Sequence, residues 1–208
     1  MKHTRNAREL QELRAKKPRI IGITGGIGSG KTVATDALSE RGYYVVDADE
    51  VSRKMFARGT DGERALCELF PAAATDGALD RAVLRAIIAS DIKERTKLNS
   101  YTHPLILEET ARLIGGKTPV VLSAPLLFET GLSRLCDVIV CVYCPKDIRI
   151  KRLAARDGVD YAAAKKIIEA QIPDTERATL ADYVVPSDTD INSFKEEIIE
   201  LFDNIIRN

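Results

Sequence analysis

The segment from Gly25 to Thr32 has the clearest chemistry in the sequence. It reads Gly-Gly-Ile-Gly-Ser-Gly-Lys-Thr and fits G-x-x-x-x-G-K-[S/T], in which glycines let backbone N–H groups turn toward phosphate oxygens. Lys31 adds an ammonium over the β- and γ-phosphates, and the Thr32 hydroxyl is a ligand for Mg²⁺. We predict that a nucleotide phosphate chain contacts these residues: Gly26, Ile27, Gly28, Ser29, Gly30, Lys31, Thr32 and Val33.

Two aspartates follow a second apolar run, at Asp47 and Asp49. Residues two apart on an extended backbone point to the same side. In phosphoryl transfer a carboxylate either accepts the proton of the acceptor hydroxyl or holds Mg²⁺. Asp49 is our first choice for the base, and Asp47 is the second, with a metal or water-mediated role. The alternative is that Asp49 only caps the following helix.

Three arginines at helical spacing follow Pro145, namely Arg149, Arg152 and Arg156. Their spacing places them on one helix face, where guanidinium groups can neutralise the charge of a transferring phosphoryl group. The alternative is a solvated basic face.

The elements that must position these residues follow from hydrophobic runs. Runs at 19–24, 43–47, 118–124, 137–143 and 182–185 alternate with helical patterns, which predicts an α/β fold with a five-stranded parallel sheet and helices on both faces. The helix after the glycine loop is expected at Lys31–Arg41. Ligands collect at the carboxyl ends of parallel strands, so the loops after Thr24, Asp47 and Ala124 should converge.

Residues 52–116 are predicted to form an almost wholly helical insertion. Helices are expected at Asp61–Phe70, Asp80–Ser90 and Asp91–Gly115, the last broken or divided at Pro104. His103 is interpreted as a substrate contact from this insertion and not as a proton carrier, because a lone histidine is more often structural.

The third strand ends in Ser123-Ala124 and lacks the aspartate that a GTPase switch or a mechanochemical ATPase uses for its metal. A small-molecule kinase fits better. The following Pro125, Leu126 and Leu127 are equally compatible with core packing and with a pocket wall.

Composition excludes several other classes. Lysine plus arginine equal aspartate plus glutamate at 31 each, so no global basic field favours nucleic acid as a partner. Seven basic and two acidic side chains lie in the first 19 residues, and we interpret residues 1–18 as a basic extension outside the fold. We expect a cytoplasmic chain without a membrane segment, whose four cysteines are reduced. Cys141 and Cys144 both fall in the run Asp137–Pro145, which is typical of a strand. Residues three apart on a strand face opposite sides, which disfavours a zinc or redox site.

An ordered set of motifs over about residues 19–190 resembles the dephospho-CoA kinase family. The set comprises Thr24–Thr32, Asp47-Ala48-Asp49, Leu79-Asp80-Arg81, His103-Pro104-Leu105-Ile106, Pro125–Glu129, Arg152 through Gly158, and Gln171 through Arg177. The glycine motif alone indicates only a P-loop protein, and the ordered set is far more specific. The sequence departs from the family's usual pattern at Ser123-Ala124, at Pro186-Ser187 and in residues 1–18.

The resemblance implies a P-loop kinase domain over residues 19–208, with a three-layer α/β/α core, a helical substrate lobe at about 52–116 and a lid at about 146–177. It implies that ATP and Mg²⁺ are used to phosphorylate the ribose 3′-hydroxyl of dephospho-CoA. Asp49 would be the catalytic carboxylate and Arg152 the phosphate-stabilising arginine. We add Lys31 and Asp47 as catalytic, Arg149 and Arg156 as nucleotide contacts, and Asp49, His103 and Pro125–Leu127 as substrate contacts.

The expected assembly is a monomer or a small homo-oligomer. Two alternatives remain open: another P-loop kinase that acts on a nucleoside, nucleotide or small alcohol, and a nucleotide-binding switch that transfers nothing.

Overall fold

The computed structural model describes residues 20–207, so the basic extension predicted at 1–18 lies outside the described residues. The chain forms two compact units. One contains residues 20–46 and 116–207, and the other is Asp47–Gly115. The chain therefore enters the second unit after one strand of the sheet and leaves it before the next.

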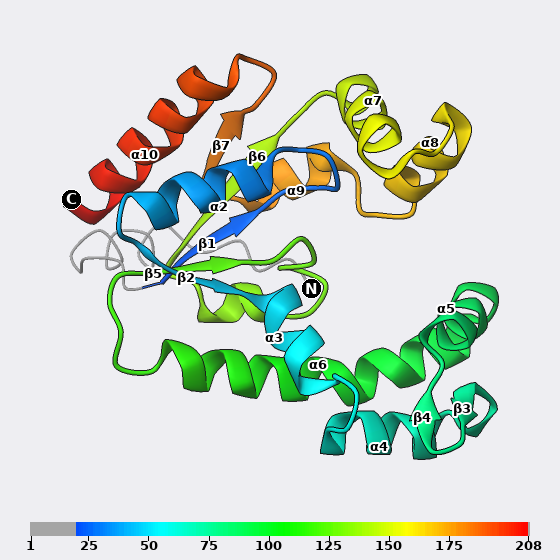
Figure 1. Ribbon diagram of the computed structural model, residues 1–208. Helices are drawn as coiled ribbons and strands as arrows, with labels where there is room; N and C mark the ends of the chain where they lie inside the picture. Colours follow the sequence, from blue (N-terminus) through cyan, green and yellow to red (C-terminus); the bar gives the residue numbers. More distant parts are fainter. Residues whose placement is uncertain (1–19, 208) are drawn as a thin grey trace. The chain divides into compact units, whose positions relative to one another are not determined.

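The first unit is built on the five expected strands, which are confirmed: β1 (Ile20–Thr24), β2 (Tyr44–Asp47), β5 (Val120–Ser123), β6 (Val138–Tyr143) and β7 (Tyr183–Pro186). Their order is β2-β5-β1-β6-β7 (Figure 1). The central strand β1 pairs in parallel with β5 and β6, and Ile21 lies opposite Val121 on one side and Val138 on the other. This arrangement brings the carboxyl ends of β5 and β6 to either side of the glycine loop.

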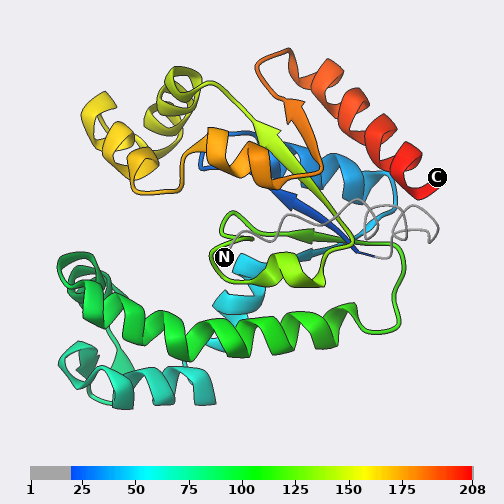
Figure 2. The ribbon, with the colours of Figure 1, turned by 180° about the vertical axis from the view of Figure 1, so that it is seen from behind.

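Helices cover both faces of this sheet. On one face α2 (Lys31–Glu40) and α10 (Ile191–Arg207) pack on a core in which Ile21 and Ile23 are fully buried. On the other face lie the 3₁₀ helix η2 (Leu132–Leu135) and α9 (Asp174–Leu180) (Figure 2). Gly22 faces this second layer, and a Cβ there would lie 2.6 Å from Cys136 Sγ. The strands are apolar on both faces because both are covered.

The helices α7 (Lys146–Asp157) and α8 (Tyr161–Glu169) form a hairpin with its own small core. Gly158 ends α7 with a φ of 67°, in the left-handed region that favours glycine. The Asp160 side chain then caps α8 by accepting the N–H of Ala163. Ile27 of the glycine loop packs on this core, so the hairpin is anchored to the loop.

The second unit contains α3 (Ala48–Met55), α4 (Asp61–Leu69), η1 (Pro71–Ala73), β3 (Ala74–Thr75), β4 (Ala78–Leu79), α5 (Arg81–Ser90) and α6 (Ile92–Ile114). Thr60, Asp80 and Asp91 cap α4, α5 and α6 with their side chains. The unit has a separate hydrophobic core, which includes Phe56 and Phe70.

One element of this segment was not predicted, and one expectation is wrong. The antiparallel pair β3–β4 was not predicted, and it turns through Asp76 and Gly77, which both have positive φ. A strand of two residues is too short to show an alternating pattern. The helix α6 also runs unbroken through Pro104. Thr102 and Ile106, on either side of the proline, are both buried, so tertiary packing offsets the hydrogen bond that proline removes.

Glu63 on α4 is a buried acid that the sequence did not reveal. Its carboxylate accepts the N–H of Gly59 at 2.6 Å and of Leu79 at 3.2 Å, and it thereby ties the start of α4 to β4. These bonds, led by the one from Gly59, hold the pKa of Glu63 below its usual value.

We expect Glu63→Gln to lower the denaturation midpoint at pH 7 and to weaken the acid sensitivity of stability. The folded-state pKa is depressed, so the contribution is present above the unfolded-state pKa and is lost as pH falls through the folded-state value. Urea unfolding curves from pH 7 down to pH 3 measure this effect. The exposed Glu68 on the same helix gives a matched control, Glu68→Gln, and identical pH profiles for the two variants would contradict the expectation.

None of the helices within residues 20–207 has the length and apolar character needed to cross a bilayer.

Candidate active site

The loop between β1 and α2 has the backbone of an anion site. Gly28 and Gly30 have φ values of 79° and 94°, in the left-handed region that favours glycine. Gly30 directly precedes α2, and no side chain in the described part of the chain caps this helix. The dipole of α2 at this end favours a negatively charged ligand.

Three successive carbonyl groups of this loop are bonded from the outside. Arg149 Nε donates to the carbonyl oxygen of Ile27 at 2.7 Å, and Arg152 Nη1 donates to that of Gly28 at 3.4 Å. The hydroxyl of Ser187 donates to the carbonyl oxygen of Ser29. These bonds restrict the backbone of the loop, and a loop held in this way can bind an anion through its N–H groups.

Ile27 differs from the rest of the predicted phosphate contacts. Its N–H donates to Gln171 Oε1 at 2.9 Å, and its side chain packs in the α7–α8 core. Ile27 therefore links the loop to the hairpin, and in this structure its N–H is engaged by protein.

Arg149 lies beside the loop backbone with a side chain only 2% exposed. It pairs with Asp174, and a Cβ on Gly26 would lie 2.2 Å from Arg149 Nη2, so this close approach requires glycine at position 26. Burial, and secondarily the charge of Arg177, lowers the pKa of Arg149 to about 10. The contacts of Arg149 in this structure are therefore structural supports of the loop.

Arg152 and Arg156 point to different partners, although both lie on α7. Arg152 Nη2 donates to the carbonyl oxygen of Ser187 at 2.7 Å, and its Nη1 has longer contacts, including 3.3 Å to Ser187 Oγ. Arg156 is exposed and forms a two-point pair with Asp157, at 2.7 and 3.1 Å. The predicted single arginine face thus divides into two residues on the loop backbone and one at the surface.

Lys31 is anchored at the carboxyl end of β5. Its Nζ donates to Ser123 Oγ at 2.7 Å, and Ser123 is fully buried. The hydroxyl therefore occupies the strand end where the sequence lacks an aspartate. Thr24 Oγ1 donates to the carbonyl oxygen of Pro125 at 3.4 Å, so the loops after β1 and β5 meet as predicted.

The residues after β5 divide between core and surface. Leu127 is fully buried near Gly22, whereas Leu126 is 41% exposed and Pro125 is half-buried. Leu127 therefore packs in the core, and the exposed side chain available to border a pocket is that of Leu126.

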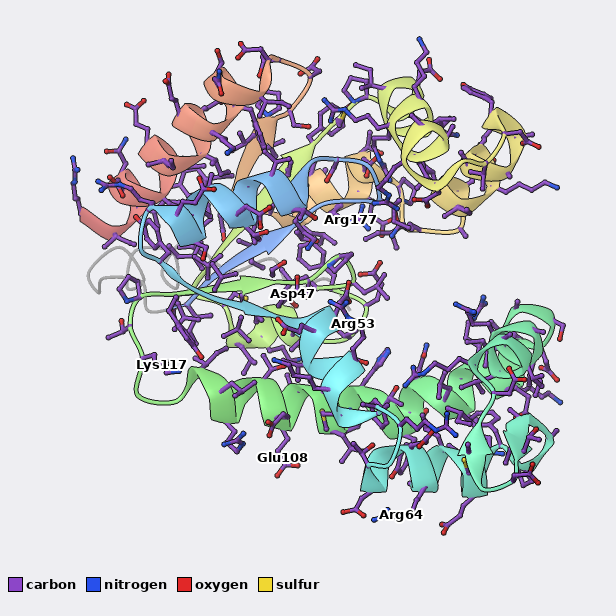
Figure 3. The ribbon with its side chains drawn as sticks, in the orientation of Figure 1. Asp47, Arg53, Arg64, Glu108, Lys117 and Arg177 are labelled. Atoms are coloured by element: carbon purple, nitrogen blue, oxygen red, sulfur yellow. The ribbon has the colours of Figure 1, made fainter. Side chains whose placement is uncertain are left out.

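Asp47 lies at the start of the second unit, where β2 meets α3 (Figure 3). Asp49 follows in the first turn of α3. Asp47 caps α3, because its Oδ1 accepts the N–H groups of Asp49 at 2.8 Å and of Glu50 at 3.1 Å. Asp49 is exposed in the first turn of the helix. The alternative that Asp49 is the cap is wrong, because Asp47 is the cap. His103 also belongs to this unit, half-buried on α6.

The cysteines fit a structural role. Cys136, Cys141 and Cys144 are buried, and burial raises the pKa of Cys141 to about 11. Within residues 20–207 no group of three or more His, Cys, Asp or Glu side chains is arranged to hold a metal ion.

Sequence reasoning missed several supports of the loop: Ser123, Gln171, Asp174, Arg177 and Ser187. Gln171 and Arg177 are the first and last residues of one motif of the family resemblance, and that motif was the only sequence signal for them. The bonds themselves join residues far apart in the chain, so no local pattern reveals them.

Comparisons with known proteins match one family over most of the chain. The sequence profile of the dephospho-CoA kinase family matches residues 19–193. A dephospho-CoA kinase of Anaeromyxobacter dehalogenans is 41% identical over 174 residues, which cover 80% of this chain and 82% of the relative. One from Methylococcus capsulatus is 36% identical over 183 residues, with 86% and 92% covered.

The fold is also found among solved structures. The crystal structure of TT1252 from Thermus thermophilus has a TM-score of 0.76 and 31% sequence identity, and the match covers 91% of this chain and 98% of that one. The family profile spans the glycine loop, both aspartates, Lys31 and the α7 arginines. The chain therefore belongs to the dephospho-CoA kinase family.

Proposed function

We propose that the protein transfers the γ-phosphoryl group of ATP to the 3′-hydroxyl of the ribose of dephospho-CoA, giving coenzyme A and ADP. The observation that carries the proposal is the glycine loop, whose carbonyl groups are bonded from the outside by Arg149, Arg152 and Ser187. Membership of the family supplies the identity of the acceptor.

The phosphates of ATP bind along residues 26–33, mainly through the backbone N–H groups from Gly28 to Val33, and Gly26 gives the loop its close fit to Arg149. Lys31 exchanges its bond to Ser123 for the β- and γ-phosphate oxygens. Its charge stabilises the negative charge that develops as the phosphoryl group moves.

The Thr32 hydroxyl is suited to be a ligand of Mg²⁺. It is exposed in the first turn of α2, next to the loop. Mg²⁺ is usually held by one or two protein oxygens together with phosphate oxygens and water, so a single threonine hydroxyl fits. When bound, Mg²⁺ neutralises charge on the β- and γ-phosphates.

Asp49 acts as the general base. Its carboxylate takes the proton of the 3′-hydroxyl while the ribose oxygen bonds to the γ-phosphorus. The bond from that phosphorus to the bridging oxygen breaks, and its electron pair leaves on ADP. Asp47 holds the start of α3, and thus Asp49, in place and adds a second negative charge for a metal or water.

The α7–α8 hairpin forms the lid of the site together with the segment that leads to α9, at about residues 146–177. Arg152 keeps its short Nη2 bond to Ser187 and turns Nη1, whose contacts are longer, to the transferring group. Arg149 supports the nucleotide indirectly, and Arg156 approaches it from the surface when the lid closes. Closure excludes water, which would otherwise accept the phosphoryl group.

The acceptor contacts that we assign are Asp49 and His103 in the second unit, and Pro125 and Leu126 after β5 in the first unit. Leu127 is fully buried, and its packing in the core fixes the position of the segment after β5.

An acceptor panel tests the proposal. With ATP and Mg²⁺ we expect ADP release to depend on dephospho-CoA and to be at least about 100-fold slower with nucleosides, nucleotides or small alcohols, because their contacts with the acceptor site are fewer. Dephospho-CoA lacking the 3′-hydroxyl is the matched control and should give no transfer. NMR of the product locates the new phosphate.

The same assay separates the alternatives. Equal rates with other alcohols would favour a different small-molecule kinase. ATP binding without any acceptor-dependent ADP would favour a nucleotide-binding switch.

A further inference from the structure

Arg177 lies on α9 (Figure 3). It is fully buried, yet two of its three guanidinium nitrogens have no hydrogen bond within the described residues. Its Nη1 donates to Asp174 Oδ1 at 3.0 Å. Its Nε and Nη2 have no hydrogen-bond partner among the described residues. A buried charge is costly, and an apolar side chain of similar size is often at least as stable in such a place. Stability alone therefore does not explain an arginine here.

Asp174 connects Arg177 to the glycine loop. Its two carboxylate oxygens are divided between two arginines, because Oδ1 bonds Arg177 and Oδ2 pairs with Arg149. Arg149 in turn donates to the carbonyl oxygen of Ile27 and contacts Gln171 Oε1, which accepts the N–H of Ile27. A continuous series of charged hydrogen bonds thus runs from Arg177 to the backbone that receives the phosphates.

Glu129 lies at the other side of Arg177. Its Oε1 is 3.8 Å from Arg177 Nη2, which is within ion-pair distance but too long for a hydrogen bond. The Nε and Nη2 atoms form one edge of the planar guanidinium, and this edge matches the two oxygens of a carboxylate. Glu129 ends the segment Pro125–Glu129 that follows β5, which is the segment proposed to border the acceptor.

We propose that Arg177 is a positioning residue for phosphoryl transfer, which couples the glycine loop to the segment after β5. Through Asp174 and Arg149 it holds the loop that binds ATP, and through Glu129 it holds the segment beside the acceptor. The inference rests on the proposed function for the identity of the acceptor. Arg149 and Arg177 share the single carboxylate of Asp174, and Glu129 supplies the second negative charge that balances the pair.

Three variants separate the two connections. Glu129→Gln removes the charge on the acceptor side, so kcat/KM for dephospho-CoA should fall about 10-fold while the Kd for ATP stays within about twofold. Asp174→Asn breaks the connection to the loop, so the Kd for ATP should rise about 10-fold. Arg177→Lys keeps a positive charge but loses the two-point edge, so both quantities should worsen and kcat/KM should fall by up to about 100-fold.

The double variant Arg177→Lys/Glu129→Gln tests the coupling itself. If Glu129 acts through Arg177, the second substitution adds little. The kcat/KM of the double variant should therefore lie within about twofold of that of Arg177→Lys alone. Arg41→Lys is the matched control, since Arg41 also pairs with an aspartate, Asp203, at 2.8 Å, but lies outside the site. It should leave both quantities unchanged.

Several outcomes would overturn the inference. These are additive effects in the double variant, equal effects of Glu129→Gln and Asp174→Asn on ATP binding, and an Arg177→Lys protein that is altered only in thermal stability. If Arg177→Lys does not fold, the other two variants still test the inference. Glu129→Gln should lower kcat/KM for dephospho-CoA without changing the Kd for ATP, whereas Asp174→Asn should raise the Kd for ATP. If the wild-type protein does not phosphorylate dephospho-CoA, the proposed function fails, whereas ATP binding measured by equilibrium dialysis still tests the connection through Asp174.

Discussion

Replacing Lys31 with alanine is expected to lower kcat for phosphoryl transfer by about 1000-fold or more, with the fold retained. The Lys31 ammonium is already held 2.7 Å from Ser123 Oγ at the end of β5, so little reorganisation is needed when a nucleotide binds. Preorganised charge opposite a developing negative charge is among the largest contributions to catalysis, and loss of one such donor commonly costs 100- to 1000-fold. In the proposed function Lys31 also neutralises two phosphates, so we expect the effect of its loss to lie at or above the upper end of this range.

The measurement is the steady-state rate of ADP formation with saturating ATP and dephospho-CoA, together with circular dichroism to show folding. Lys117→Ala is the matched control. Lys117 lies before β5, where its Nζ sits 3.7 Å from the centre of the Tyr44 ring, and it has no part in the proposed site. A Lys31→Ala enzyme within 10-fold of the wild-type kcat would show that another group stabilises the transferring phosphoryl.

The sheet and the glycine loop were predictable because their signals are local. Each core strand is a short apolar run, and the pattern Gly28–Thr32 requires particular backbone angles whatever surrounds it. The order of strand, loop and helix then placed the loop at the carboxyl end of β1, since parallel strands leave no other arrangement.

The partners of the arginines were not predictable from spacing. Helical periodicity groups Arg149, Arg152 and Arg156 on one side of α7, but it does not say what each of them contacts, and Arg156 lies at the surface. In the structure Arg149 and Arg152 contact the backbone of the glycine loop and donate to its carbonyl oxygens. Buried backbone carbonyl groups require hydrogen-bond donors, as backbone N–H groups require acceptors. An arginine near a phosphate loop can thus serve the loop itself as well as the ligand.

Burial decided the other differences. The sequence does not distinguish the adjacent Leu126 and Leu127 as core or surface residues. In the structure Leu127 is fully buried, whereas Leu126 is 41% exposed. The helix α6 continues past Pro104 because the buried residues on both sides hold it. Such choices depend on packing between distant segments, which overrides local propensity.

The two aspartates show how local structure narrows a functional choice. Asp47 and Asp49 are equivalent as a pair of carboxylates, but only Asp47 accepts the N–H groups at the start of α3. Because this bonding gives Asp47 a supporting role, we propose the exposed Asp49 as the proton acceptor.

Asp49→Asn is therefore expected to lower kcat by about 100- to 10,000-fold, which is the range that general-base catalysis contributes. Asparagine has nearly the same shape but cannot take the proton of the 3′-hydroxyl at neutral pH. The Kd for ATP should stay within about twofold, because the residues proposed to hold the phosphates belong to the glycine loop and α2. Single-turnover rates and equilibrium ATP binding measure the two quantities separately.

Two control variants make the result specific to Asp49. Glu50→Gln changes the neighbouring acid, which is paired with Lys54 at 2.7 Å, and should leave kcat unchanged. Asp47→Asn keeps a good helix cap, because asparagine caps as well as aspartate does, and should lower kcat by no more than about 10-fold. If Asp47→Asn is instead the variant that loses catalysis while Asp49→Asn retains it, then the proton goes to Asp47, and the bonds that cap α3 must reorganise when the acceptor binds.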